Sequence, residues 1–381
     1  MSTFNLDLTG VAVVDNHAHA LTRRQPEDGV SFREHFTEAH SPLLARDHVG
    51  TAAHYRWALR QLGRVLDVPP LERAILEHRH RLGLVPYTRL LMREANLMAV
   101  LLDEGYPPAD LAYSSDEMAE MLGVRVARIV RLETVVQTLI SAHPHFAEVV
   151  SAFDAALEAA VADGYVALKS IAAYRTGLRI APVTDDEAEQ AFGPARIESM
   201  LPTRFRLASK HLIDFFVLRA LRFAAERSVP VQFHTGYGDP DLDLRLANPL
   251  HLRPLFEEPS LSGAPIVLLH ESYPFTAEAA FLAASYPNAY LDLAFSLPPL
   301  DHGELMRVTR TALGVAPASK LMCSSDGTRI PEHYWLGAVR ARQCIGSVLE
   351  AMVAADDLDE HDAVELATMI LRDNALRVYG L

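Results

Sequence analysis

Features that would point to other classes of protein are scarce in this sequence of 381 residues. Only Cys323 and Cys344 occur as cysteines, so neither a disulfide framework nor a thiolate zinc cluster is available. The expected compartment is therefore a reducing one, the cytoplasm. No apolar stretch approaches the roughly 18 residues of a membrane span. The first residues, MSTFNLDLTG, lack the basic start and apolar run of a secretory signal.

Positive charge is also in short supply. Lys and Arg number 35 against 49 Asp and Glu, which gives a formal net charge of -14. Such a field repels phosphate backbones and anionic headgroups, so nucleic acid and membranes are poor candidates as partners. Because 50% of the residues are hydrophobic and 22% are charged, we expect an ordered protein with a large core.

Short apolar or β-branched runs alternate with longer helical segments along the chain. This alternation is typical of parallel strands joined by helical crossovers. Eight strands are expected, the number that closes an α/β barrel of the (β/α)8 TIM type. They are Val11 to Asn16, Leu97 to Leu102, Val126 to Leu132, Val166 to Ile171, Val229 to Phe233, Ile266 to Leu269, Ala289 to Leu293 and Leu321 to Ser324.

Two helical insertions account for the length beyond the roughly 250 residues of a minimal barrel. The first covers about 22–94 and is broken by prolines; the second covers 172–203 and contains the acidic run 185–187. Both leave the carboxyl ends of strands, so we expect both to lie over the mouth of the barrel and to select the substrate. With no internal repeat and no Gly/Ser linker, residues 1–381 are predicted to form one domain.

Side chains that suit a metal ion stand at the carboxyl ends of the predicted strands. They are His17, His19, His234, His270 and Asp326. Because these ends meet at one face of a barrel, the groups are expected to converge on a divalent ion, zinc first and manganese or iron otherwise. One histidine at a strand end is more often a hydrogen-bonded core residue. His78 and His80 repeat the spacing of His17 and His19, but in a polar segment expected to be a solvated helix.

Five motifs, in their usual order, resemble the metal-dependent amidohydrolase superfamily. They are DNHAH at 15–19, LKS at 168–170, QFHTG at 232–236, LLHESYP at 268–274 and SSDG at 324–327. Three further segments and the closing DNALRVYGL look closest to the amidohydrolase 2 branch; they are ALKSIAAYRTGL at 167–178, HTGYGD at 234–239 and LDLAFSLP at 291–298. The chain is most similar to the amidohydrolase portion of FluG and nodulin-type proteins. In those proteins that portion is fused to a glutamine synthetase-like part, which we expect to be absent here.

The resemblance implies one or two ions bound by the five strand-end residues. Lys169 matches the lysine that is carboxylated in binuclear members and bridges two ions; the alternative is an ordinary cation beside the substrate. Glu133 is a competing ligand, since some deacetylases of the superfamily place a glutamate there; otherwise it pairs with Arg131 or Arg175. Only about ten residues precede the first strand, so the β-sandwich of many amidohydrolases is not expected.

The chemistry implied is hydrolysis by metal-activated water. Asp326 is expected to take the proton of the water and pass it to the leaving nitrogen, while His270 or a second ion helps to hold the oxyanion. For Asp326 the alternative is a helix N-cap. Arg175 is expected to bind a substrate carboxylate, or else to pair with Glu133 or with the acidic run. Residues expected to line the pocket or to pack in its wall are Tyr174, Tyr237, Glu271, Tyr273 and Trp335.

Three classes of function compete. The preferred one is cleavage of a C–N bond in a small amide, with a γ-glutamyl compound as the example, because Lys169 and Asp326 are both present. The second is nonoxidative decarboxylation of a small, often aromatic, acid, which would release carbon dioxide without an amine. The third is a scaffold without catalysis, which needs no general base. A homodimer is expected, because barrels of this kind often pair.

Overall fold

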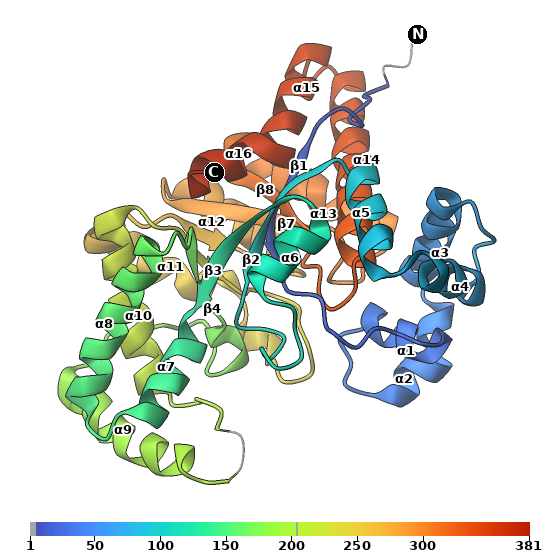
Figure 1. The fold of residues 1–381 in the computed structure, drawn as a ribbon. Coiled ribbons are helices and arrows are strands. Elements are labelled where there is room, and N and C mark those ends of the chain that lie inside the picture. Colours follow the sequence, from blue (N-terminus) through green and yellow to red (C-terminus); the bar gives the residue numbers. More distant parts are fainter. Residues whose placement is uncertain (1–4, 203–204) are drawn as a thin grey trace.

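The computed structural model describes residues 5–202 and 205–381 (Figure 1). Eight parallel strands form one sheet in the order β1 to β8, each paired with the next strand along the chain. All eight predicted strands are confirmed, with each end within two residues of the expected one. The strands are β1 Val13–Ala18, β2 Leu97–Asp103, β3 Arg125–Arg131, β4 Ala167–Ser170, β5 Val231–Phe233, β6 Ile266–Leu268, β7 Ala289–Ala294 and β8 Leu321–Ser324.

The first and last strands come together at one seam. The backbone N–H of Asp326 donates to the carbonyl of His17 over 3.1 Å, and the N–H of Ser325 donates to Asp15 Oδ1 over 2.9 Å. This seam brings β8 against β1, so the sheet forms the predicted (β/α)8 barrel. Every named strand of the described residues belongs to this sheet, and no β-sandwich accompanies it there.

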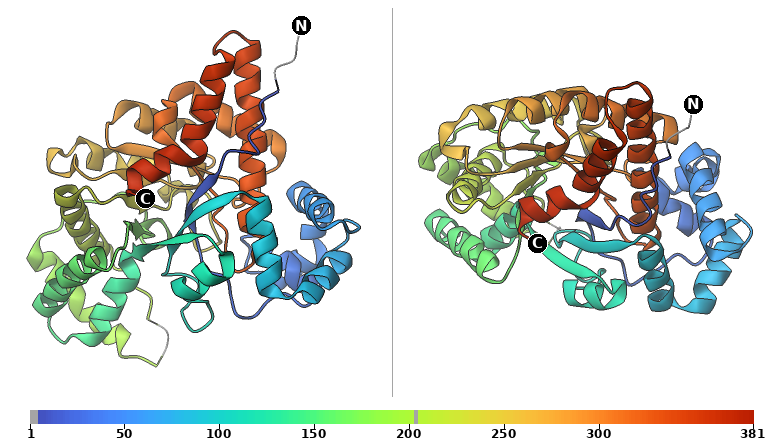
Figure 2. Two further views of the ribbon diagram at one scale, coloured as in Figure 1. Left: turned by 45° about the horizontal axis from the view of Figure 1, so that its top comes forward. Right: turned by 90° about the horizontal axis from the view of Figure 1, so that it is seen from above.

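Helices surround the sheet (Figures 1 and 2). The barrel helices that follow the strands are α5 Leu84–Glu94, α6 Ser115–Leu122, α7 Leu132–Ala142, α8 Phe146–Ala162, α10 Lys210–Arg227, α11 Arg253–Glu257, α12 Thr276–Ser285, α13 His302–Val315 and α14 Glu332–Ala354. The others are α1 Gly29–Arg33, α2 Pro42–Asp47, α3 Ala53–Leu66, α4 Glu72–Leu82, α9 Asp185–Ser199, α15 Glu360–Thr368 and α16 Asn374–Tyr379. None of the helices in the described ranges combines the length and the hydropathy needed to cross a membrane.

The two insertions differ in how they meet the barrel. In the first, α1 and α2 lie at the end toward which β1 runs (Figure 1), whereas α5 packs on β2, α6 and α14. The insertion is therefore shorter than expected, because α5 is the first crossover helix of the barrel. In the second, α9 packs on α7 and α10. The expected last residue of this insertion, Thr203, lies outside the described residues.

The apolar interior of the barrel is closed by α16. Side chains from six strands, with Leu269 after β6, form one buried cluster, and Ala375 and Tyr379 of α16 complete it. Gly380 ends this helix in the left-handed conformation (φ 67°), in which a glycine has no Cβ to clash. Figure 1 shows α16 at the opposite end of the barrel from α1, α2 and α9.

Candidate active site

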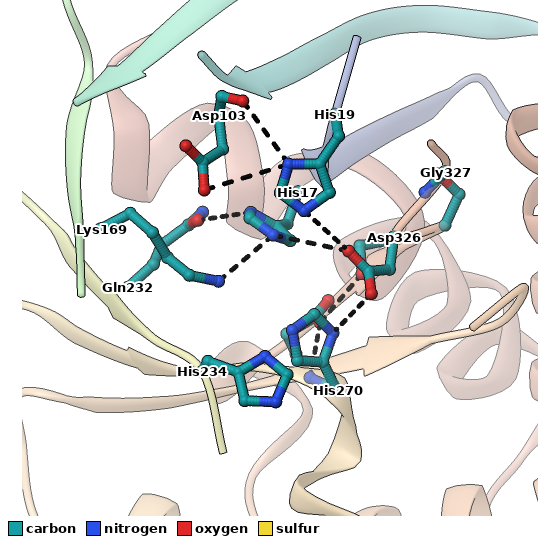
Figure 3. A network of polar contacts seen from close by, with 12 residues as sticks. His17, His19, Asp103, Lys169, Gln232, His234, His270, Asp326 and Gly327 are labelled. Atoms are coloured by element: carbon teal, nitrogen blue, oxygen red, sulfur yellow. Dashed lines mark hydrogen bonds and ion pairs between the residues drawn. The ribbon is translucent and has the colours of Figure 1, made fainter. Parts of the chain in front are cut away.

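Side chains from three strand ends point toward one another at the mouth of the barrel (Figure 3). His17 lies in β1, His19 follows it directly, and Asp326 follows β8. The distance from Asp326 Oδ1 to Nε2 is 3.6 Å for His17 and 3.3 Å for His19. His270, after β6, places Nδ1 3.6 Å from Asp326 Oδ2. These groups, predicted from separate parts of the sequence, lie together in space.

His234 and Lys169 border this cluster. The His234 ring lies 4.5 Å from that of His270 between centroids, and its Nε2 is 3.1 Å from the carbonyl of Tyr237. Lys169 Nζ is 3.2 Å from His17 Nε2. The structure therefore gathers all six predicted ligands, with His17, His19 and Asp326 offering the tightest set of ligand atoms.

The donor set fits a divalent ion. Asp326 Oδ1 and His270 Nδ1 are buried and have no hydrogen-bond partner among the described residues. Such atoms are unfavourable unless something binds them. Two ligands that each lie 2.0–2.1 Å from a tetrahedral zinc ion are about 3.3 Å apart. The separations of 3.3 and 3.6 Å between Asp326 and the two histidines of β1 are close to this value.

The electrostatics keep the imidazoles in the form that binds metals. Burial lowers the pKa of His17, His234 and His270 well below 6.5, and the charge of Lys169 adds to the effect. Neutral imidazole is the metal-binding form. Burial also lowers the pKa of Lys169 to about 8, against the opposing influence of Asp103. Its amine thus loses its proton more readily than an exposed lysine, as carboxylation requires.

Two of the predicted ligands, Asp326 and His270, have left-handed backbone conformations. Asp326 has a φ of 49°, and α14 begins only at Glu332, so Asp326 is not a helix N-cap. His270, Glu271 and Ser272 have φ values of 63°, 49° and 51°. Each such residue costs roughly 1–2 kcal/mol and persists only where its surroundings hold it. The N–H of His270 donates to Asp292 Oδ2 over 3.1 Å, which helps to hold this turn.

His19 lies beside a buried ion pair that was not predicted from the sequence. Asp103 ends β2 and lies 2.6 Å from Arg131 of β3, and its Oδ2 is 4.0 Å from His19 Nδ1. Asp103 could have been identified as a site residue because it stands at the carboxyl end of a predicted strand, but it belongs to none of the motifs in the sequence. Burial alone would raise the pKa of Asp103, yet Arg131, His19 and Lys169 hold it below its usual value.

We expect Arg131→Met to lower the free energy of unfolding at pH 7 by about 3–5 kcal/mol, because it leaves Asp103 buried and unpaired. The folded pKa of Asp103 is lowered. The contribution is therefore present above about pH 4 and is lost as the pH falls through the folded value. Urea unfolding at several pH values measures it. In the control Arg73→Met, which breaks an exposed pair with Glu77, the loss should stay below about 0.5 kcal/mol. Equal losses in both variants would contradict this account.

Glu133 does not form the ion pair considered for it. It lies in the first turn of α7, where Oε1 accepts hydrogen bonds from Ser170 Oγ over 2.7 Å and from the N–H of Ile171 over 3.0 Å. Arg131 pairs with Asp103 instead, and no ion pair joins Glu133 to Arg175 among the described residues. The hydrogen bonds of Glu133 therefore connect the end of β4 to the first turn of α7.

A cavity of about 550 Å³ opens over the cluster. Tyr174 and Arg175 line it, as predicted. The other four residues named for the pocket or its wall do not line it: Trp335 and Glu271 are buried, and Tyr237 and Tyr273 are not among the lining residues. Burial raises the pKa of Glu271 well above 4.5, and Asp292 adds to the effect. The left-handed turn directs Glu271 away from the cavity.

The first insertion supplies part of the cavity wall through residues that the sequence analysis missed. They are Glu34, His35, Thr37, Glu38, Ala39 and His40. The segment therefore covers the mouth, as expected of an insertion at the end of β1. Its sequence carries no periodic signal that says which side chains face the site.

Fold and site together define a (β/α)8 barrel protein with a cluster of metal-type ligands at its mouth. Residues 188–381, just over half of the chain, match the model of the amidohydrolase family. The chain belongs to this family, which confirms the predicted membership.

Two relatives extend the comparison, and one of them is a curated protein. The protein fluG of Emericella nidulans is 34% identical over 238 residues, which are 60% of this chain and 27% of that protein. The chain thus matches about a quarter of its curated relative. A crystal structure from Lactobacillus casei, described as a candidate metal-dependent hydrolase, is 29% identical, with a TM-score of 0.89 over 99% of this chain and 98% of that one.

Glucuronate isomerase from Caulobacter crescentus has the same fold. It is 14% identical, with a TM-score of 0.66 over 98% of this chain and 92% of that one. At this identity the likeness shows the barrel alone. The family assignment therefore rests on the family model, which matches just over half of the chain.

Proposed function

We propose that the protein is a metal-dependent hydrolase that cleaves the amide C–N bond of a small substrate bearing a carboxylate, with a γ-glutamyl amide as the first choice. One observation carries the proposal: Asp326 Oδ1 is buried, has no hydrogen-bond partner among the described residues and faces His17 and His19 at the floor of the cavity. Membership in the amidohydrolase family and the description of the Lactobacillus casei relative support it.

His17, His19 and Asp326 would hold the ion together with His234 and His270, and Lys169, if carboxylated, would allow a second. The ion, zinc first and manganese or iron otherwise, would lower the pKa of bound water toward roughly 7 and so supply hydroxide at neutral pH. Asp326 takes the proton of the attacking water and gives it to the leaving nitrogen. His270 stabilises the oxyanion that develops on the substrate carbonyl.

Arg175 is the candidate anchor for the substrate carboxylate. It lines the cavity, its Nε is buried without a partner, and no ion pair of its guanidinium occurs among the described residues. Burial lowers its pKa to about 10, and the charge of Arg206 adds to the effect, so the group remains charged at neutral pH. A desolvated guanidinium without a partner suits a carboxylate bound by two hydrogen bonds.

We expect Arg175→Met to raise KM roughly 10- to 100-fold with little change in kcat, because hydrogen bonds to charged groups contribute about 1.5–3 kcal/mol. Steady-state kinetics on the preferred amide measures this effect. Arg175→Lys should recover only part of it, since an ammonium cannot form the paired contact. The matched control is Arg253→Met, which changes an exposed arginine paired with Glu257. A fall in kcat at constant KM would contradict the assignment.

The decisive experiment combines metal analysis with a panel of γ-glutamyl amides and aromatic acids. We expect stoichiometric metal and release of amine or ammonia from an amide. Carbon dioxide release from an acid, with all amides unchanged, would refute the hydrolase in favour of a decarboxylase. We expect the enzyme to act as a single-domain cytoplasmic homodimer, and its two free cysteines, both buried, are compatible with a reducing compartment.

A further inference from the structure

Tyr379 places a polar atom inside the barrel, at the end opposite the cavity. It belongs to α16, is 4% exposed and packs in the inner apolar cluster. A buried hydroxyl needs partners, and this one has two. It accepts a hydrogen bond from Gln232 Nε2 over 2.8 Å and donates to Asn16 Oδ1 over 3.1 Å. Both partners are fully buried neighbours of predicted metal ligands.

The amide of Gln232 has a fixed orientation. Its Nε2 also donates to the backbone carbonyl of Asn16 over 2.8 Å, and a carbonyl can only accept. Gln232 Oε1 therefore faces His17 Nδ1, at 2.8 Å. Because an amide oxygen can only accept as well, His17 carries its proton on Nδ1. Its Nε2 then presents a lone pair to Asp326 at 3.6 Å (Figure 3).

The second partner of Tyr379 leads toward another ligand. Asn16 Nδ2 donates to Asp292 Oδ1 over 2.6 Å, and Asp292 Oδ2 accepts from the backbone N–H of His270 over 3.1 Å. The Tyr379 hydroxyl thus hydrogen-bonds to two amides. The Gln232 amide contacts His17, and the Asn16 amide is connected to His270 through Asp292.

We infer that Tyr379 is a positioning residue for metal binding, which helps to hold the tautomer of His17 through Gln232, together with the backbone carbonyl of Asn16, from the far end of the barrel. The inference rests on the metal site of the proposed function and adds a residue that contacts neither metal nor substrate. Partners that orient ligand histidines typically change metal affinity about 10- to 100-fold when they are removed.

The test is Tyr379→Phe, with Zn²⁺ binding measured by competition with a chelating dye and no substrate present. We expect roughly tenfold weaker binding, at the lower end of that range because Gln232 keeps its bond to the carbonyl of Asn16. Tyr55→Phe is the matched control. It removes another buried tyrosine hydroxyl, which donates to Glu72 Oε1 over 2.7 Å in the first insertion, and should leave zinc affinity unchanged.

Two further measurements separate positioning from packing. In a cycle with Gln232→Leu, the losses of zinc affinity should be non-additive, because both changes act through one path. In the metal-free protein, nitrogen NMR of labelled histidine should show the Nδ1–H tautomer of His17 in the wild type and a mixture in Tyr379→Phe. Unchanged affinity and tautomer in Tyr379→Phe, or additive losses, would overturn the inference, whatever happens to stability. Wild-type protein that binds no zinc would refute the inference together with the metal site, whereas zinc binding without amide cleavage would refute the proposed function alone.

Discussion

Purified His17→Ala is expected to lack stoichiometric metal and to have no measurable hydrolytic activity. The change removes one of the three ligand atoms that lie closest together and also the partner of Gln232. The loss of metal affinity should exceed the roughly 100-fold that marks the upper range for residues that only orient a ligand. Elemental analysis after dialysis, with dye competition for the affinity, measures the effect.

The chain offers its own control for this experiment. His78 and His80 repeat the two-residue spacing on α4, and His80 is exposed. Side chains two apart on a helix do not share a face, so this pair cannot converge as the pair of β1 does. His80→Ala should keep full metal content and activity. Metal retained at wild-type stoichiometry in His17→Ala would rule out the site described above.

Asp326→Asn is expected to lower kcat by roughly 10²- to 10⁴-fold, the usual contribution of a general acid or base. Asparagine keeps the size of the side chain but cannot take a proton from the attacking water. Rates on the preferred amide should be compared with metal content measured in the same preparation, so that loss of chemistry is separated from loss of metal. Asp110→Asn, at an exposed position, is the control. Activity within a few-fold of wild type would assign the proton transfer to another group.

The barrel could be predicted from the sequence because most of its strands are short, largely apolar runs buried on both faces, which stand out between amphipathic helices. The metal-type ligands could be predicted for a related reason. His234, His270 and Asp326 each end such a run, and the geometry of parallel strands places those ends together. The residues that orient the ligands could not be found in this way. Asn16 and Gln232 are ordinary polar residues in the sequence, and their role depends on Tyr379, which meets them only in the folded barrel.

The cavity wall was harder to predict than its floor. Glu271 directly follows the predicted ligand His270, yet its side chain is buried. Three consecutive residues, 270–272, are left-handed there, and no local sequence pattern predicts such a turn. Trp335 was expected in the wall, but it lies on α14 and is buried in the core. Where the chain leaves a strand, the direction of a side chain depends on tertiary contacts.

The predicted ligands lie on strands or within two residues of strand ends, whereas much of the rim comes from the segment 34–40. Exchanges in that segment would alter which molecule is admitted while the reactive groups keep their coordinates. Selection for a new substrate and conservation of the reaction can thus proceed in separate stretches of the gene. This separation lets one set of reactive groups serve different substrates.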